Sequence, residues 1–229
     1  MSEKYYMNNH INEPGLYILC GRSGMGKTTL AINILSQKLK DKETDSALYF
    51  HSDPLSEDLL NRFKDSGIDF ININDVAGRS VEGILYQARW TKEDKNLSMI
   101  VIDDFYDLLR YESFKHIEPK RKERIAYLLI CFKCLADLFD IPVILIADAD
   151  EYIDSKKDKH PGLSDMRDKK LIKEFADRLM FMYADAYYEA DTELKNITEI
   201  RIIDLKKNTE HNHRLAYIGN STYHEPDGE

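Results

Sequence analysis

A glycine-rich segment at residues 21–28, GRSGMGKT, constrains this chain more than any other part of its sequence. It matches the pattern G-x-x-x-x-G-K-[ST] and stands between the apolar run Leu16 to Cys20 and a helical pattern that starts at Lys27. Glycines let such a backbone curl, so that its N–H groups and the following helix N-terminus point at phosphate oxygens. The segment therefore predicts a nucleotide phosphate loop within a strand–loop–helix unit.

The side chains of this loop have separate predicted tasks. Lys27 would reach the β- and γ-phosphates and act in catalysis, and the Thr28 hydroxyl would ligate Mg²⁺. We therefore expect ATP and Mg²⁺ as cofactors. The residues expected to contact the nucleotide are Gly21, Ser23, Gly24, Met25, Gly26, Lys27, Thr28 and Thr29.

Two carboxylates are expected beside the loop. The apolar run Met99 to Ile102 ends in Asp103, where a neighbouring strand would present a carboxylate to the metal. Asp53 follows another short apolar run, Ala47 to Phe50, and is the candidate for orienting or deprotonating a water molecule. Aspartate is also common in turns and helix caps, so a structural role stays open for both residues.

Apolar runs alternate with helical patterns along the chain. Strands are predicted at 16–20, 47–50, 68–73, 97–102 and 143–147, and helices at 27–39, 56–63, 81–90 and 125–139. This alternation is typical of an α/β fold with a mainly parallel sheet covered on both faces. Short runs at 179–183, 200–203 and 215–218 predict an antiparallel addition at the C-terminal end, with residues 208–213 as a hairpin tip.

The composition disfavours several classes of protein. The chain has 229 residues, is 43% hydrophobic and 32% charged, and carries a net charge of −9, which fits one globular domain. Its apolar runs are far shorter than the roughly 20 residues of a membrane helix, and its start is polar. We therefore expect a cytoplasmic protein with no membrane association. Its three cysteines are expected to be buried thiols rather than zinc ligands.

Several segments together resemble the motor domain of the DnaB-type replicative DNA helicases, a RecA-like P-loop NTPase. SGMGKTTLAINI resembles the phosphate loop and first helix of that family, and IVIDDFYDLL resembles its metal-binding strand. LSDMRDKKLIKEFADRLMFMY resembles the motif that follows its DNA-facing loop. The resemblance implies a polar tail at residues 1–13, a RecA-like ATPase domain at 14–225 and a short tail at 226–229.

The resemblance also implies a function. Members of that family form rings of six subunits with ATP between neighbours and single-stranded DNA in the centre. We therefore expect an ATP hydrolase of DNA-helicase type that couples ATP to single-stranded DNA binding or unwinding in replication. A homo-oligomer and a replication protein partner are expected with it. The family's N-terminal domain and linker helix lie outside the resemblance, because only about 13 residues precede the first predicted strand.

The sequence departs from the family pattern at four positions, one of which is Leu205, where the family has a lysine in its last hairpin. Asp53 replaces the catalytic Glu, which draws the carboxylate back by one methylene, and Asp148 replaces a Gln that senses phosphate or DNA. Lys207, or Lys206 after a one-residue shift, aligns with the arginine finger and lacks its planar fork. These departures favour slow hydrolysis. The alternative is a degenerate, nucleotide-gated binding module that acts through a partner protein.

One basic segment is the candidate for contact with DNA. Residues 115–124 hold five cations and two glutamates, a local charge of 5 − 2 = +3 within a predicted loop at 111–124. The family has a pore-facing loop at this place. A solvated charged surface is the alternative. The candidate residues are Lys115, Lys120, Arg121, Lys122 and Arg124.

Overall fold

The computed structural model describes residues 8–39, 45–51, 61, 71–73, 80–111, 120–219 and 222–224. Its strands are β1 (Gly15–Gly21), β2 (Asp45–His51), β3 (Ile71–Ile73), β4 (Asn96–Asp103), β5 (Pro142–Asp148), β6 (Arg178–Tyr183), β7 (Ile197–Asp204), β8 (Thr209–Gly219) and β9 (Thr222–His224). Within the described residues they form one nine-stranded sheet in the order β3-β2-β4-β5-β1-β6-β7-β8-β9. Pairs from β3 to β6 are parallel, and those from β6 to β9 are antiparallel.

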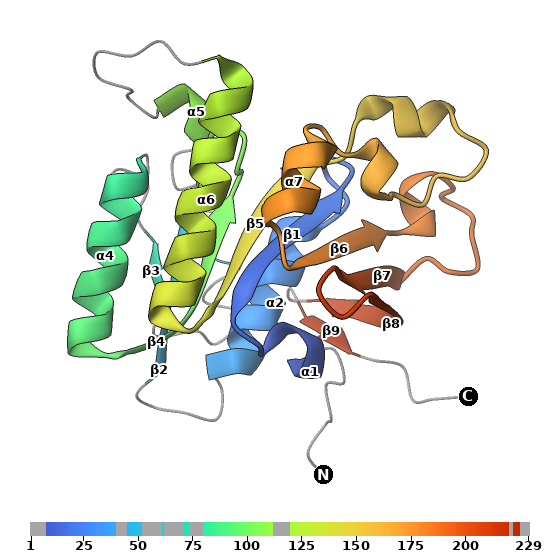
Figure 1. Cartoon of the computed structure of the whole chain (residues 1–229). Coiled ribbons are helices and arrows are strands. Elements are labelled where there is room, and N and C mark those ends of the chain that lie inside the picture. Colours follow the sequence, from blue (N-terminus) through green and yellow to red (C-terminus); the bar gives the residue numbers. More distant parts are fainter. Residues whose placement is uncertain are drawn as a thin grey trace.

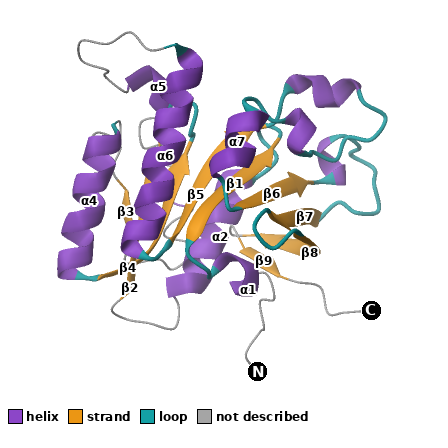
Figure 2. Ribbon diagram, viewed as in Figure 1, coloured by secondary structure: helices purple, strands orange, loops and turns teal. Residues whose placement is uncertain are grey.

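Helices cover both faces of this sheet (Figures 1 and 2). The α-helices are α1 (Asn8–Ile11), α2 (Lys27–Leu39), α4 (Val81–Asp94), α5 (Leu108–Tyr111), α6 (Arg121–Phe139) and α7 (Lys169–Phe175). Short 3₁₀ helices are η2 (Glu151–Ser155), η3 (Leu163–Asp165) and η4 (Asp185–Tyr187). One apolar layer joins α4, α6 and α7 to the sheet, and a second joins α1 and α2 to the opposite face.

The central strand β1 contributes to both layers. Ile18 packs in the layer beneath α6, whereas Tyr17 and Leu19 pack in the layer beneath α2. All seven residues of the strand are buried. A strand covered on both faces has no solvent side, which explains why its sequence is a continuous apolar run rather than an alternating one.

The predicted fold class is confirmed, but several predicted boundaries differ from the structure, most clearly those of α6 and of the β7–β8 turn. Helix α6 begins at Arg121, so part of the predicted loop 111–124 is helical. The Glu123 carboxylate accepts the Lys120 N–H at 2.9 Å and so caps the helix at this earlier point. The β7–β8 turn is residues 205–208 rather than 208–213. Its backbone N–H groups at 206 and 207 bind the Asp204 carboxylate, which closes the turn before β8.

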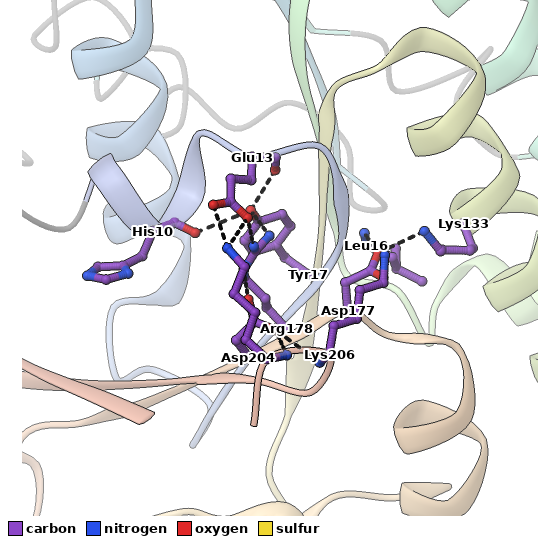
Figure 3. Close-up of polar contacts among 10 residues, drawn as sticks. His10, Glu13, Leu16, Tyr17, Lys133, Asp177, Arg178, Asp204 and Lys206 are labelled. Atoms are coloured by element: carbon purple, nitrogen blue, oxygen red, sulfur yellow. Dashed lines mark hydrogen bonds and ion pairs between the residues drawn. The ribbon is translucent and has the colours of Figure 1, made fainter. Parts of the chain in front are cut away.

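A polar network joins the β7–β8 turn to the amino ends of β1 and β6 (Figure 3). The Arg178 guanidinium binds Asp204 at 3.0 Å and the Tyr17 hydroxyl at 2.6 Å, and it also pairs with Glu13. Buried Asp177 accepts the Leu16 N–H at 2.7 Å. It also pairs with Lys133 of α6 and Lys206 of the turn, at 3.0 and 2.6 Å. Residues distant in sequence thereby hold this edge of the sheet together.

The cysteines differ in exposure. Cys20 in β1 is buried, and burial raises the pKa of its thiol to about 12. Cys134 is exposed because it lies on the outer face of α6, so the expectation of a buried thiol is wrong there. Among the described residues, no helix combines the length and apolar character needed to cross a bilayer.

Paired substitutions in α6 test this packing. Phe132 is fully buried in the layer beneath α6, whereas Leu138 on the same helix is 75% exposed. We expect Phe132→Ala to lower the free energy of unfolding by about 3–5 kcal/mol, because it leaves a cavity. Leu138→Ala should change it by less than about 0.5 kcal/mol. Urea denaturation followed by circular dichroism measures both, and equal losses would contradict the packing described.

Candidate nucleotide-binding site

The carboxyl ends of four adjacent strands meet at one edge of the sheet. In the register of β1 with β5, Gly21 lies opposite Asp148. In the register of β2 with β4, His51 lies opposite Asp103. Because these strands are parallel, their last residues form a row beside the phosphate loop. Ligands of open α/β sheets bind at this kind of edge.

The phosphate loop has a backbone that depends on glycine. Gly24 and Gly26 adopt positive φ angles of 77° and 101°. A Cβ atom on Gly26 would lie 3.1 Å from the Tyr223 hydroxyl and 3.3 Å from the Met182 methyl group. The Leu30 N–H binds the Gly26 carbonyl at 2.9 Å, so α2 starts directly from the loop. Its N-terminus therefore faces the space where phosphates are expected.

All the residues predicted to contact nucleotide lie in this loop or the first turn of α2. Ser23 and Gly24 are exposed at the tip of the loop. Met25 is buried in the layer beneath α2, and its backbone N–H bonds to the Arg22 carbonyl. Lys27 is only 7% exposed and points toward the ends of the strands.

Two oxygen donors suited to Mg²⁺ lie together next to the loop. The Thr28 hydroxyl donates to Asp103 Oδ2 at 2.6 Å. The described residues contain no cluster of three His, Cys, Asp or Glu side chains that could hold a metal. Mg²⁺ does not require one, because it usually takes one or two protein oxygens together with water and phosphate. The pair formed by Thr28 and Asp103 therefore fits Mg²⁺ held jointly with a nucleotide.

Two residues of β2 also lie next to Asp103, and the sequence analysis did not identify either of them. The Tyr49 hydroxyl donates to Asp103 Oδ2 at 2.6 Å, and His51 Nε2 lies 3.9 Å from the same oxygen. The two side chains are two positions apart on one strand, so they share a face of the sheet. That alternation at the end of β2 is the signal that could have identified them.

A further carboxyl group beside Asp103 has an altered acidity. Burial raises the pKa of Asp104 to about 6, and the charges of Asp148 and Asp103 act in the same direction. Its carboxylate accepts the Tyr106 N–H at 2.8 Å, which orders the turn that leads to α5. This edge of the sheet thus concentrates negative charge next to the phosphate loop.

Two cations of the phosphate loop are held by carboxylates at the end of β5 and beyond it. Lys27 Nζ lies 2.6 Å from Asp148 Oδ1 and 3.0 Å from the Arg22 carbonyl. The Arg22 guanidinium binds both oxygens of Asp154, at 3.0 and 2.8 Å, and thereby lowers the pKa of that carboxyl. The Tyr188 hydroxyl also donates to Asp154, at 2.9 Å. No local sequence pattern predicts these contacts, because the partners are far apart in the sequence.

Lys207 lies away from this site. It belongs to the β7–β8 turn, at the amino end of β6 and hence at the opposite edge of the sheet. Its ammonium group binds Glu13, a residue of the network in Figure 3, at 2.7 and 2.8 Å. Within one chain it does not approach the phosphate loop, so a finger role for Lys207 requires the site of another copy.

The four candidate DNA residues that the structure describes are of two kinds: arginines bound to other parts of the chain, and exposed lysines. Arg121 binds Asp168 at 3.0 Å, and the Arg124 guanidinium binds the carbonyl of residue 109. Lys120 and Lys122 are exposed at the start of α6. Lys115 and the proposed catalytic Asp53 lie outside the described residues.

Comparison with known proteins gives a coherent result. The family described as the DnaB-like helicase C-terminal domain matches residues 68–225. The replicative DNA helicase DnaB of Geobacillus stearothermophilus is 26% identical over 241 residues, covering 93% of this chain and 52% of that protein. The DnaB helicase of Pasteurella multocida is 28% identical over 236 residues, covering 89% and 50%. The chain thus spans about half the length of these relatives.

Two solved structures share the fold, each at 23% sequence identity. A DnaB-like replicative helicase, described with its interactions with primase, has a TM-score of 0.78 over 94% of this chain and 58% of its own. The second structure, described as an ATPase domain, has a TM-score of 0.77 over 93% of this chain and 85% of its own. The RecA-like fold expected from the sequence is therefore confirmed.

Removal of the Tyr49 hydroxyl tests its role in orienting Asp103. We expect Tyr49→Phe to raise the Mg²⁺ concentration needed for half-maximal nucleotide binding by about 10- to 100-fold, the range for groups that orient a metal ligand. Titration of Mg²⁺ at constant concentration of a fluorescent ATP analogue measures the change. Tyr127→Phe, on the outer face of α6, is the control, and equal behaviour of the two variants would exclude this role.

Proposed function

The chain belongs to the DnaB-like helicase C-terminal domain family, and from this premise we propose that it is a Mg²⁺- and ATP-dependent motor domain of the replicative helicase type. The observation that carries the proposal is the meeting of Lys27, Thr28 and Asp103 at the end of the phosphate loop. These groups supply a cation for phosphates and two oxygens for Mg²⁺, at the edge of the sheet where nucleotides bind.

Each residue has a defined part in the proposed reaction. Lys27 would bind the β- and γ-phosphates, and the N–H groups of the loop would surround them. Thr28 and Asp103 would hold Mg²⁺, which neutralises charge on the phosphates when bound. Asp53 would orient the attacking water. Lys207 would reach the nucleotide of a neighbouring copy, because it lies at the opposite edge of the sheet.

Assembly and substrate follow the same proposal. The relatives are replicative DNA helicases, so single-stranded DNA is the proposed substrate, with exposed Lys120 and Lys122 as candidate contacts. A hexamer would supply Lys207 in trans. One structural neighbour is described with primase, which favours a replication protein as partner here too. The proposed ATPase domain spans residues 14–225. Replication of the DNA of a cell, phage or mobile element would place it in the cytoplasm.

Steady-state ATP hydrolysis with Mg²⁺, measured with and without single-stranded DNA, tests this function. We expect turnover that DNA stimulates and that Lys27→Ala abolishes, because the phosphates lose their principal cation. Asp53→Glu should raise turnover by up to about 100-fold, since it extends the carboxylate by one methylene. Nucleotide-independent unwinding, or turnover that Lys27→Ala leaves intact, would refute the proposed motor.

A second candidate function is favoured by one specific observation. Asp148 binds Lys27 at 2.6 Å, and such a pair opposes phosphate binding. If this pair keeps hydrolysis slow, the chain would be a nucleotide-gated binding module. Such a module would act through a partner protein and would not move along DNA. Capture of a replication protein that requires ATP and persists with a non-hydrolysable analogue would support this function. DNA-stimulated turnover and processive unwinding would exclude it.

A further inference from the structure

The phosphate-loop lysine is already engaged by a carboxylate. Lys27 Nζ lies 2.6 Å from Asp148 Oδ1, and the lysine side chain is only 8% exposed. Asp148 is the last residue of β5 and lies opposite Gly21 in the register, so backbone pairing holds it beside the loop. Its own side chain is 40% exposed, so the carboxylate has room to turn toward solvent.

We propose that Asp148 competes with the nucleotide's phosphates for Lys27, so that a triphosphate binds by displacing this carboxylate. The inference rests on the proposed nucleotide binding and adds a residue that sets its affinity. A triphosphate and the Asp148 carboxylate are both anions, and one ammonium group has only three donors. One of those donors is directed at the Arg22 carbonyl, 3.0 Å away.

The surrounding charges favour displacement of Asp148 over sharing. Asp103 and Asp104 lie at the adjacent strand end, and Asp148 already acts on the acidity of Asp104. The phosphates of ATP would add several negative charges to this group. Movement of Asp148 into solvent relieves that repulsion, and the partial exposure of its carboxylate makes the movement possible without disruption of β5.

Displacement of Asp148 would also affect residues 149–168, the segment that follows β5. The Ala149 N–H binds the Gly21 carbonyl at 3.0 Å, and Ala149 forms a bridge with Met166. Five residues further along, Asp154 holds Arg22 of the phosphate loop. The start of residues 149–168 is therefore tied to the phosphate loop twice, through Asp148 directly before it and through Asp154 within it. Loss of the contact between Lys27 and Asp148 on nucleotide binding would therefore loosen this segment.

Equilibrium binding of a fluorescent, non-hydrolysable ATP analogue in Mg²⁺ tests the competition. We expect Asp148→Asn and Asp148→Gln to tighten binding by about 3- to 30-fold, the order of magnitude of a partly exposed ion pair. Asp148→Glu keeps the charge and should remain within about threefold of wild type. Asp158→Asn removes the same charge from an exposed site on the same segment and should change affinity by less than about twofold.

The outcomes separate this inference from the proposed function. If wild type binds the analogue and Asp148→Asn binds equally or more weakly, the competition is refuted and nucleotide binding stands. If wild type, Asp148→Asn and Lys27→Ala all fail to bind the analogue, the proposed function fails. A tightening shared by Asp158→Asn would mean general charge repulsion and would also overturn the specific role of Asp148. Thermal denaturation of each variant shows whether the fold is retained.

Amide hydrogen exchange gives a readout of the link to the following segment. We expect the analogue to raise exchange at residues 149–155 in wild type, because the contact at Asp148 is lost. Asp148→Asn should show raised exchange there before the analogue is added. Unchanged exchange in both proteins would refute the proposed coupling, whatever the affinities are.

Discussion

The parallel pairing of β1 with β5 and of β2 with β4 is the constraint on which the site depends. These registers bring Gly21 beside Asp148 and His51 beside Asp103. The apolar layers on the two faces hold the strands in this register, because a shift by one residue would exchange side chains between the two layers and disrupt the packing of both. The phosphate loop is thereby joined by the Asp103 carboxylate proposed to hold Mg²⁺, by the Tyr49 hydroxyl and by the Asp148 carboxylate, each from a different strand.

The two edges of the sheet have different electrostatic character. The carboxyl edge gathers Asp103, Asp104 and Asp148 around a loop with two cations. The amino edge holds its lysines in ion pairs, with Lys206 on Asp177 and Lys207 on Glu13. The proposed nucleotide site at one edge and the lysine-bearing turn at the other are consistent with the proposed assembly, in which one copy would complete the site of the next.

Local sequence determined which parts could be predicted. The strand–loop–helix unit from β1 to α2 and the alternation of strands and helices rest on neighbouring residues, and both were recovered from the sequence. The start of α6 was missed because the Glu123 cap lies within a segment that is mostly charged. The ion pair between Lys27 and Asp148 was not predictable, since it depends on strand order rather than on spacing along the chain. The same holds for Tyr49 on Asp103.

A crystal structure with Mg²⁺ and a non-hydrolysable ATP analogue would test the central claim most directly. We expect the triphosphate in the loop at residues 21–28, with Lys27 on a phosphate oxygen and Thr28 and Asp103 beside the metal. Asp148 should have turned away from Lys27. A nucleotide bound elsewhere would contradict the assigned site, and a triphosphate in the loop with the Lys27–Asp148 contact intact would contradict the competition.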